Sequence, residues 1–122
     1  MATFLTKLPS ALQNVIKAVN KLTSAGNQSA NINTTSDKLF LLSEVEIFGS
    51  TTYSKSGEGS QYAYYKAGNS KVKKANGSAS IWWERSPVRI KGNSFCRVSR
   101  DGIGDQYSSA SLSEGVAFGF CI

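Results

Sequence analysis

The chain has 122 residues, which suffices for one domain with a core but not for two. Apolar residues make up 40% of it and charged residues 18%, a balance typical of globular proteins and not of disordered ones. The net charge is +6, and histidine, the commonest general base and metal ligand, is absent. No segment approaches the roughly 18 apolar residues that span a bilayer, so we expect no membrane insertion.

After a short lead over residues 1–7, the sequence predicts an amphipathic helix over about residues 8–25. Apolar side chains recur there with a helical period, at Leu8, Leu12, Val15, Ile16, Val19 and Leu22. Pro9 suits the first turn of a helix, and Gly26 suits the left-handed residue after its last turn. We expect this helix to pack on a sheet-and-loop region over residues 38–122, so that residues 8–122 form a single domain.

Residues 27–37 are polar and predict a surface loop, whereas residues 38–49 predict a strand. Polar and apolar residues alternate in the second half of that strand, which indicates one wet face. Glu44 and Glu46 would project from that face, roughly 7 Å apart by the rise of a strand. Two carboxylates so placed could serve glycoside hydrolysis, but nothing else in the sequence supports that chemistry. We interpret both as surface residues.

Residues 50–59 predict a loop rich in Ser, Gly and Thr, and residues 67–79 predict a second polar loop. Within the second loop, Asn76-Gly77 is the signal of a tight turn. Between the loops, residues 61–65 contain a dense aromatic group with Tyr62, Tyr64 and Tyr65. These tyrosines could form a stacking platform for sugars or bases, or seal one end of a small core, which we favour.

The last third of the chain alternates apolar segments with polar connectors. The apolar segments are residues 81–83, 95–98 and 116–122, and the connectors are rich in Ser, Gly and Arg. Short strands with such connectors predict a rigid β scaffold that carries adaptable loops. Small polar residues, an aromatic side chain and a few guanidinium groups are also the composition of binding surfaces.

The positive charge is scattered along the chain. Its densest cluster is Lys71, Lys73 and Lys74, and no arginine-rich tract or recognised nucleic-acid motif accompanies it. We therefore interpret the cluster as solvated surface, and nucleic acid as a partner that the sequence does not favour.

The residues that commonly bind metals or cofactors are few. Cys96 and Cys121 cannot make a zinc site alone, and whether they pair with each other stays open. Asp101 and Asp105 lie in one loop, but two carboxylates fall short of a calcium cage. The sequence predicts no cofactor and no metal, and it favours binding over catalysis.

Segments spread over most of the chain read LFLLSE at residues 39–44, EGSQYAYY at 58–65, WWERSP at 82–87 and GVAFGFC at 115–121. Together, and in this order, they resemble the DUF6273 family of phages, prophages and gut Firmicutes. The resemblance runs from about residue 8 to the C-terminus. It implies an α+β, C-type-lectin-like domain related to the formylglycine-generating-enzyme group, with one N-terminal amphipathic helix packed on short antiparallel strands with long polar loops.

The resemblance also divides the last third of the chain into framework and loop positions. The implied framework residues are Trp82, Trp83, Arg85, Phe95, Val98, Gly115, Phe118 and Phe120. The implied ligand-binding candidates in the loops are Arg89, Arg97, Arg100, Tyr107, Lys91, Asp101 and Gln106. Arginine and tyrosine carry binding energy most often, so the arginines and the tyrosine lead this set.

The chain departs from the family pattern at its N-terminus, where longer members carry a β-rich half before the helix. Compared with them it would be truncated, and its C-terminal strand would lack its usual partner. An unpaired strand edge favours a homodimer. The enzymes that share the fold use a reactive cysteine pair, which Cys96 and Cys121 do not reproduce in spacing or in flanking residues.

The sequence therefore predicts a non-enzymatic ligand-binding module of phage or prophage origin that recognises a host surface protein or glycan through variable C-terminal loops. The alternative is a free-standing phage-encoded inhibitor that binds a defence protein, such as a CRISPR nuclease, or its nucleic acid. A divergent enzyme of the formylglycine-generating-enzyme-like group ranks third. We expect synthesis in the cytoplasm of a bacterial host, and a product that is virion-associated as an adhesin or cytoplasmic as an inhibitor.

Overall fold

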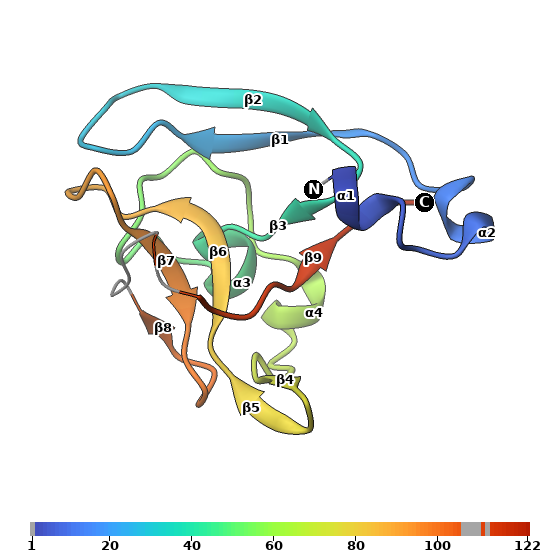
Figure 1. Ribbon diagram of the computed structural model, residues 1–122. Coiled ribbons are helices and arrows are strands. Elements are labelled where there is room, and N and C mark those ends of the chain that lie inside the picture. The colour runs from blue at the N-terminus through green and yellow to red at the C-terminus, as the bar shows by residue number, and fades with distance from the viewer. Residues whose placement is uncertain (1, 106–110, 112) are drawn as a thin grey trace.

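The computed structural model describes the backbone of residues 2–105, 111 and 113–122, and the side chains of all of these except residues 2 and 3 (Figure 1). Its helices are α1 (Ala2–Leu5), α2 (Ser10–Gln13), α3 (Glu44–Phe48) and α4 (Ala63–Lys66). Its strands are β1 (Val19–Ser24), β2 (Ile32–Asp37), β3 (Phe40–Leu41), β4 (Lys73–Ala75), β5 (Ser78–Ser80), β6 (Trp82–Pro87), β7 (Phe95–Val98), β8 (Gly104–Asp105) and β9 (Phe118–Gly119). The predicted α+β class is confirmed, as short helices combined with short antiparallel sheets.

Antiparallel pairs account for the sheets: β6, β7 and β8 form one of three strands, and β1–β2, β3–β9 and β4–β5 form the others. In Figure 1 the β1–β2 hairpin lies along one side and the β4–β5 hairpin at the opposite end, with α3, β3 and β6 between them. Segments near the two ends of the chain meet, because Lys17 bridges to Cys121 and the rings of Phe4 and Phe118 lie 5.9 Å apart.

The predicted helix over residues 8–25 is wrong. The structure keeps a single helical turn, α2, and residues 19–24 form β1 instead. The β-branched side chains of Val15, Ile16 and Val19 lose rotamer freedom in a helix and suit a strand. In β1 the side chains of Val19 and Lys21 are half-buried while that of Leu22 is exposed, so burial follows a period of two.

The predicted strand over residues 38–49 is confirmed only for β3, since residues 44–48 form α3. Ser43 caps this helix: its hydroxyl accepts from the backbone of Glu46, whose carboxylate accepts from the backbone of Ser43. This reciprocal pair is a capping box, and Gly49 ends the helix at a φ of 71°. Glu44 and Glu46 are consequently buried, and the expectation that they are surface residues is wrong.

Strong local signals predict other elements correctly. The segments at residues 81–83 and 95–98 become β6 and β7, with β6 extending to Pro87. The Asn76-Gly77 turn is confirmed, with φ values of 52° and 82°, and it joins β4 to β5 within the segment expected to be a loop. The aromatic segment forms α4, where Tyr65 is buried and Tyr64 is exposed.

The core lies where β6 meets α3 and α4. Ile47, Tyr65, Trp82 and Val98 form the buried cluster. The even-numbered residues of β6 face inward, so Trp82 belongs to the core, whereas Trp83 is half-buried on the other face. Among the other implied framework residues, Phe95 and Phe118 are half-buried and Phe120 is exposed.

The C-terminal strand has a partner, because β9 pairs with β3 through Phe40 with Gly119 and Leu41 with Phe118. This pair is a two-stranded sheet, and the homodimer through an unpaired strand edge stays a prediction. Over the residues that the structure covers, no helix is both long and apolar enough to cross a membrane.

Candidate functional site

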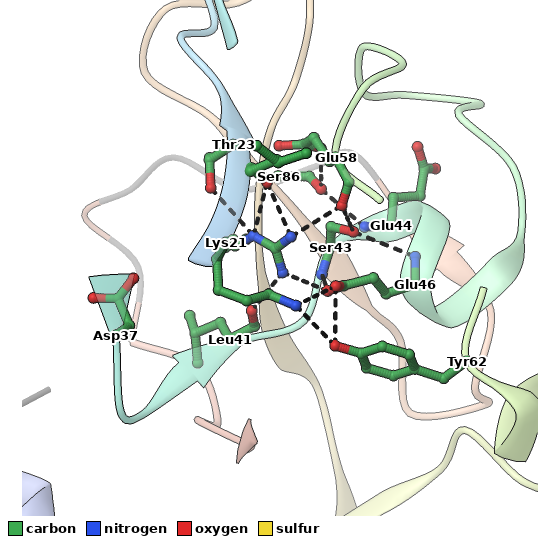
Figure 2. A network of polar contacts seen from close by, with 12 residues as sticks. Lys21, Thr23, Asp37, Leu41, Ser43, Glu44, Glu46, Glu58, Tyr62 and Ser86 are labelled. Atoms are coloured by element: carbon green, nitrogen blue, oxygen red, sulfur yellow. Dashed lines mark hydrogen bonds and ion pairs between the residues drawn. The ribbon is translucent and has the colours of Figure 1, made fainter. Parts of the chain in front are cut away.

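The interior holds a network of charged side chains centred on the carboxylate of Glu46 (Figure 2). Lys21 and Arg85 both form ion pairs with it, and the hydroxyl of Tyr62 donates to it at 3.0 Å. Burial alone would raise the pKa of Glu46, but the hydrogen bonds from Arg85, Lys21 and the backbone of Ser43 outweigh that effect and hold the pKa below its usual value. Glu46 is therefore an ionised structural group.

Arg85 is the main cross-link of this network. Its Nη1 donates to the carbonyl of Leu41 at 2.9 Å, and its Nη2 to the carbonyls of Leu22 at 2.9 Å and Glu58 at 3.0 Å. Its Nε donates to Thr23 Oγ1 at 3.2 Å. The guanidinium thus joins β1, β3 and residues 50–59 to α3, and its nitrogens are all occupied. The framework role that the family resemblance implies for Arg85 has this physical basis.

Two further buried carboxyls fasten the loop over residues 50–59. Glu44 accepts from the backbone and the hydroxyl of Ser54, at 3.0 and 2.7 Å. Glu58 accepts from the backbone of Ser24 at 2.9 Å and from the hydroxyl of Ser86 at 2.6 Å. Burial raises the pKa of Glu58, although these two hydrogen bonds work against the shift. The loop lacks regular structure and is still tied to β1 and β6.

Two buried titratable residues, Glu84 and Cys96, lie on the inner face of the β6–β7 pair. Neither carboxyl oxygen of Glu84 has a hydrogen-bond partner in the part of the chain that the structure describes, and the residue is only 1% exposed. Burial, together with the charges of Glu44 and Glu58, raises the pKa of Glu84 to about 9. Burial and the Glu84 carboxyl likewise raise the pKa of the Cys96 thiol. Both groups are neutral at pH 7.

A hollow of about 320 Å³ opens beside the C-terminal end of β6. We call it the Arg89 pocket, and its lining residues are Ser24, Gln28, Ser29, Lys55, Arg89 and Ile90. They come from three separate segments: the end of β1 with the β1–β2 connection, the loop over residues 50–59, and the turn that follows β6. Each of the cationic side chains in the lining comes from a different one of these segments.

Backbone hydrogen bonds hold the three segments together. The N–H of Gln28 donates to the carbonyl of Arg89 at 2.7 Å, and the N–H of Arg89 donates to the carbonyl of Tyr53 at 3.0 Å. Gly26 makes the close approach possible, since a Cβ there would lie 2.9 Å from Cβ of Pro87, and its φ is 74°. A glycine is required at this point for steric and conformational reasons together.

The wall of the Arg89 pocket includes an unusual backbone. Asn27 and Gln28 have φ values of 46° and 62°, directly after the positive φ of Gly26. Asparagine tolerates the left-handed region, but glutamine rarely adopts it and loses roughly 1–2 kcal/mol there. Such strain persists only where surrounding contacts impose it, and it gathers at functional sites.

A second hollow, of about 310 Å³, is lined by Leu41, Trp83, Glu84, Arg85 and Phe95. The rings of Trp83 and Phe95 meet edge to face with centroids 6.5 Å apart. The guanidinium of Arg85 is committed to the network described above, so this hollow offers aromatic surface and few free hydrogen-bonding groups.

The structure separates the predicted ligand-binding candidates. Arg89 lines the pocket, and Lys91 is exposed on the same turn. Arg97 is half-buried and forms ion pairs with Asp105 at 3.0 Å and Glu114 at 3.1 Å, so its contacts are structural. Arg100 and Asp101 are exposed on the turn between β7 and β8. Gln106 and Tyr107 lie outside the described residues.

Sequence reasoning missed Ser24, Gln28, Ser29 and Lys55 as pocket residues. The only signal was the run of Gly26, Asn27 and Gln28 after an apolar segment, which fits a turn as well as a helix end. Cys96 is buried and Cys121 exposed, and both thiols are free. In the described ranges, no group of three or more Asp, Glu or Cys side chains could hold a metal ion.

Comparisons with known proteins bear on the family alone. No curated protein and no solved structure matches the chain. The model of the family described as a domain of unknown function, DUF6273, matches residues 2–122, and the chain therefore belongs to the DUF6273 family, as the resemblance predicts.

Proposed function

We propose that this chain is a non-enzymatic ligand-binding module of phage or prophage origin, which recognises a host surface protein or glycan through loops held on a fixed scaffold. The observation that carries the proposal is the Arg89 pocket, where cationic side chains from two loops face one hollow. One of those loops follows β6 in the C-terminal region, where the sequence predicts variable ligand-contacting positions.

The scaffold supports the proposal because contacts outside the pocket lining help to fix the loops. Glu44 and Glu58 fasten the loop that carries Lys55, and Gly26 lets the β1–β2 connection pack on Pro87. Pre-organised loops lose less conformational freedom when a ligand binds. A site built in this way suits recognition.

The buried reactive groups support binding over catalysis. The Cys96 thiol has a raised pKa and is fully buried, whereas a nucleophilic cysteine needs a lowered pKa and access. Glu44, Glu46 and Glu58 spend their carboxyl oxygens on hydrogen bonds within the fold. These groups hold the structure together and do not face the Arg89 pocket with free catalytic atoms.

The finer assignment to a C-type-lectin-like fold belongs to the same proposal. Its support is that short antiparallel strands carry long loops, and that the segments at the two ends of the chain meet through Lys17, Cys121, Phe4 and Phe118. Fold by itself does not establish function, so the recognition role rests on the pocket and not on this assignment.

Affinity capture tests the proposal. The purified domain is incubated with envelope and cytosolic fractions of a bacterial host, beside a pocket variant, Lys55→Gln with Arg89→Gln. The control variant, Lys66→Gln with Lys74→Gln, removes the same charge from exposed positions outside the pocket. We expect envelope material to be retained by the parent and the control variant and lost by the pocket variant. Equal retention by both variants, or retention of a cytosolic nuclease or its RNA instead, would contradict it.

A further inference from the structure

We propose that the Arg89 pocket binds an oxyanion, the carboxylate, sulfate or phosphate group of an acidic sugar on a host glycan. This inference rests on the proposed function, because it names the ligand class for the same pocket.

Charge is the first argument. Lys55 and Arg89 both line the pocket, and the lining contains no carboxylate. Two acidic groups lie behind the lining, Glu58 bonded to Ser24 and Ser86 and Glu44 bonded to Ser54, and both are fully buried with their oxygens used within the fold. A hollow with cationic walls and no counter-charge of its own favours an anionic ligand.

Unused hydrogen-bond donors are the second argument. Lys55 makes no hydrogen bond or ion pair within the described residues. Among the described residues, Arg89 donates through Nη1 to the carbonyl of Thr51 at 3.1 Å and of Ser54 at 3.5 Å, and its Nε and Nη2 have no acceptor there. The hydroxyl of Ser29 accepts from the backbone of Asn31 and keeps its own proton to donate. An oxyanion accepts several such bonds at once, and charge-assisted bonds are the strong ones.

The backbone supplies the third argument. The strained residue Gln28 lies in the pocket wall, and its N–H is bonded to the carbonyl of Arg89. The strain is thus imposed by the contact that joins the turn of Gln28 to the turn of Arg89. Gln28 and Arg89 thus line the same pocket, and the side-chain amide of Gln28 adds a neutral donor and acceptor suited to sugar hydroxyls.

Size and polarity decide between an acidic sugar and a nucleic acid. At about 320 Å³ the hollow is a single compact site, and Ile90 adds an apolar rim that is 59% exposed. A polyphosphate backbone needs a basic stripe that neutralises many phosphates. The lysine cluster does not extend one from here, since Lys73 and Lys74 belong to β4, which lies at the opposite end of the fold from the β1–β2 hairpin (Figure 1).

Titration calorimetry with defined probes tests the inference. The probes are glucuronic acid, glucose 6-sulfate, inorganic phosphate, neutral glucose and a single-stranded oligonucleotide, each at low and at physiological salt. We expect the acidic sugars to bind at least about tenfold more tightly than glucose, and the pocket variant to lose that preference while the control variant, Lys66→Gln with Lys74→Gln, keeps it.

Three results would overturn the inference. Glucose could bind as tightly as glucuronic acid, or the pocket variant could retain the preference for acidic sugars. The oligonucleotide could bind most tightly with a steep loss on added salt. Failure here is distinguishable from failure of the proposed function: envelope capture that depends on Lys55 and Arg89 without acidic-sugar binding refutes the ligand class alone, whereas capture independent of the pocket refutes the function.

Discussion

Arg85 and Arg89 lie close together along the chain, but their guanidinium groups have different surroundings. The guanidinium of Arg85 is buried among Glu46 and the carbonyls of Leu22, Leu41 and Glu58, and all its nitrogens are occupied. The guanidinium of Arg89, at the edge of a hollow, has two nitrogens without an acceptor in the part of the chain that the structure describes. Lys21 and Lys55 differ in the same way, since only Lys21 is ion-paired.

The difference shows how a small basic protein divides its charge. Charges inside the Glu46 network are compensated within the fold, so they stabilise one arrangement of loops and offer nothing to a partner. Charges at the Arg89 pocket have no ion-pair partner among the described residues. Removing them should therefore change stability little, and they are available for recognition. Which of these two roles a basic residue has is decided by its partners and not by its type.

The largest expected effect is the contrast between Arg85→Ala and Arg89→Ala. Removing Arg85 leaves the buried Glu46 carboxylate and several carbonyls without their donor, and we expect a loss of about 3–5 kcal/mol in the free energy of unfolding. Removing Arg89 should change it by less than about 0.5 kcal/mol. Urea denaturation measures both, and similar losses in the two variants would break the comparison.

The pH dependence of stability tests the role of the buried Glu84 in the scaffold. Its pKa is raised from 4.5 to about 9 in the folded chain, so its stabilising contribution is complete below about pH 4.5 and is lost as the pH rises toward 9. The slope is about 1.4 kcal/mol per pH unit within that window. Glu84→Gln cannot ionise, and at pH 7 it should be more stable than the parent, on the order of 3 kcal/mol. Urea denaturation from pH 5 to 9 measures the free energy of unfolding of both proteins. A difference between them that does not change with pH would show that Glu84 does not hold its proton.

The smallest expected effect concerns the strained turn of the Arg89 pocket. Gln28→Gly removes the cost of a positive φ, which should outweigh the added freedom of the unfolded chain and raise stability by roughly 0.5–1 kcal/mol. The same change deletes a pocket side chain, so binding to an acidic sugar should weaken. A thermal melt and a titration on one sample check both signs, and a destabilised variant would argue against strain at this residue.

Local signals explain what the sequence could predict. The short apolar segments at residues 81–83 and 95–98 indicate β6 and β7, and Asn76-Gly77 indicates the turn between β4 and β5, because each signal depends only on neighbouring residues. The capping box of Ser43 and Glu46 is equally local and was readable, but the alternation of residues 43–48 favoured a strand. Residues 8–25 fit both periods in part, and packing of β1 against β6 and β2 decides for the strand.

The candidate site could be predicted only in part. Arg89, Arg97 and Arg100 are all arginines in the last third of the chain, and the sequence predicts each of them as a binding residue. Their surroundings in the structure differ because Glu114 and Asp105 form ion pairs with Arg97, and tertiary packing determines such partners. Lys55 and Gln28 join Arg89 only because Gly26 packs on Pro87 and residues 50–59 dock on β1, which no local pattern encodes.

The division of charge can be tested most directly by the exchange of the arginine Nε–H protons with solvent, measured by NMR on the ¹⁵N-labelled chain. We expect the Arg85 proton to exchange slowly and to be unaffected by glucuronic acid, because Nε of Arg85 donates to Thr23 and Leu22 inside the fold. The Arg89 proton should exchange rapidly in the free protein and become protected and shifted when glucuronic acid is added. An Arg89 proton that is already protected in the free protein, or that does not respond to the sugar, would contradict this account.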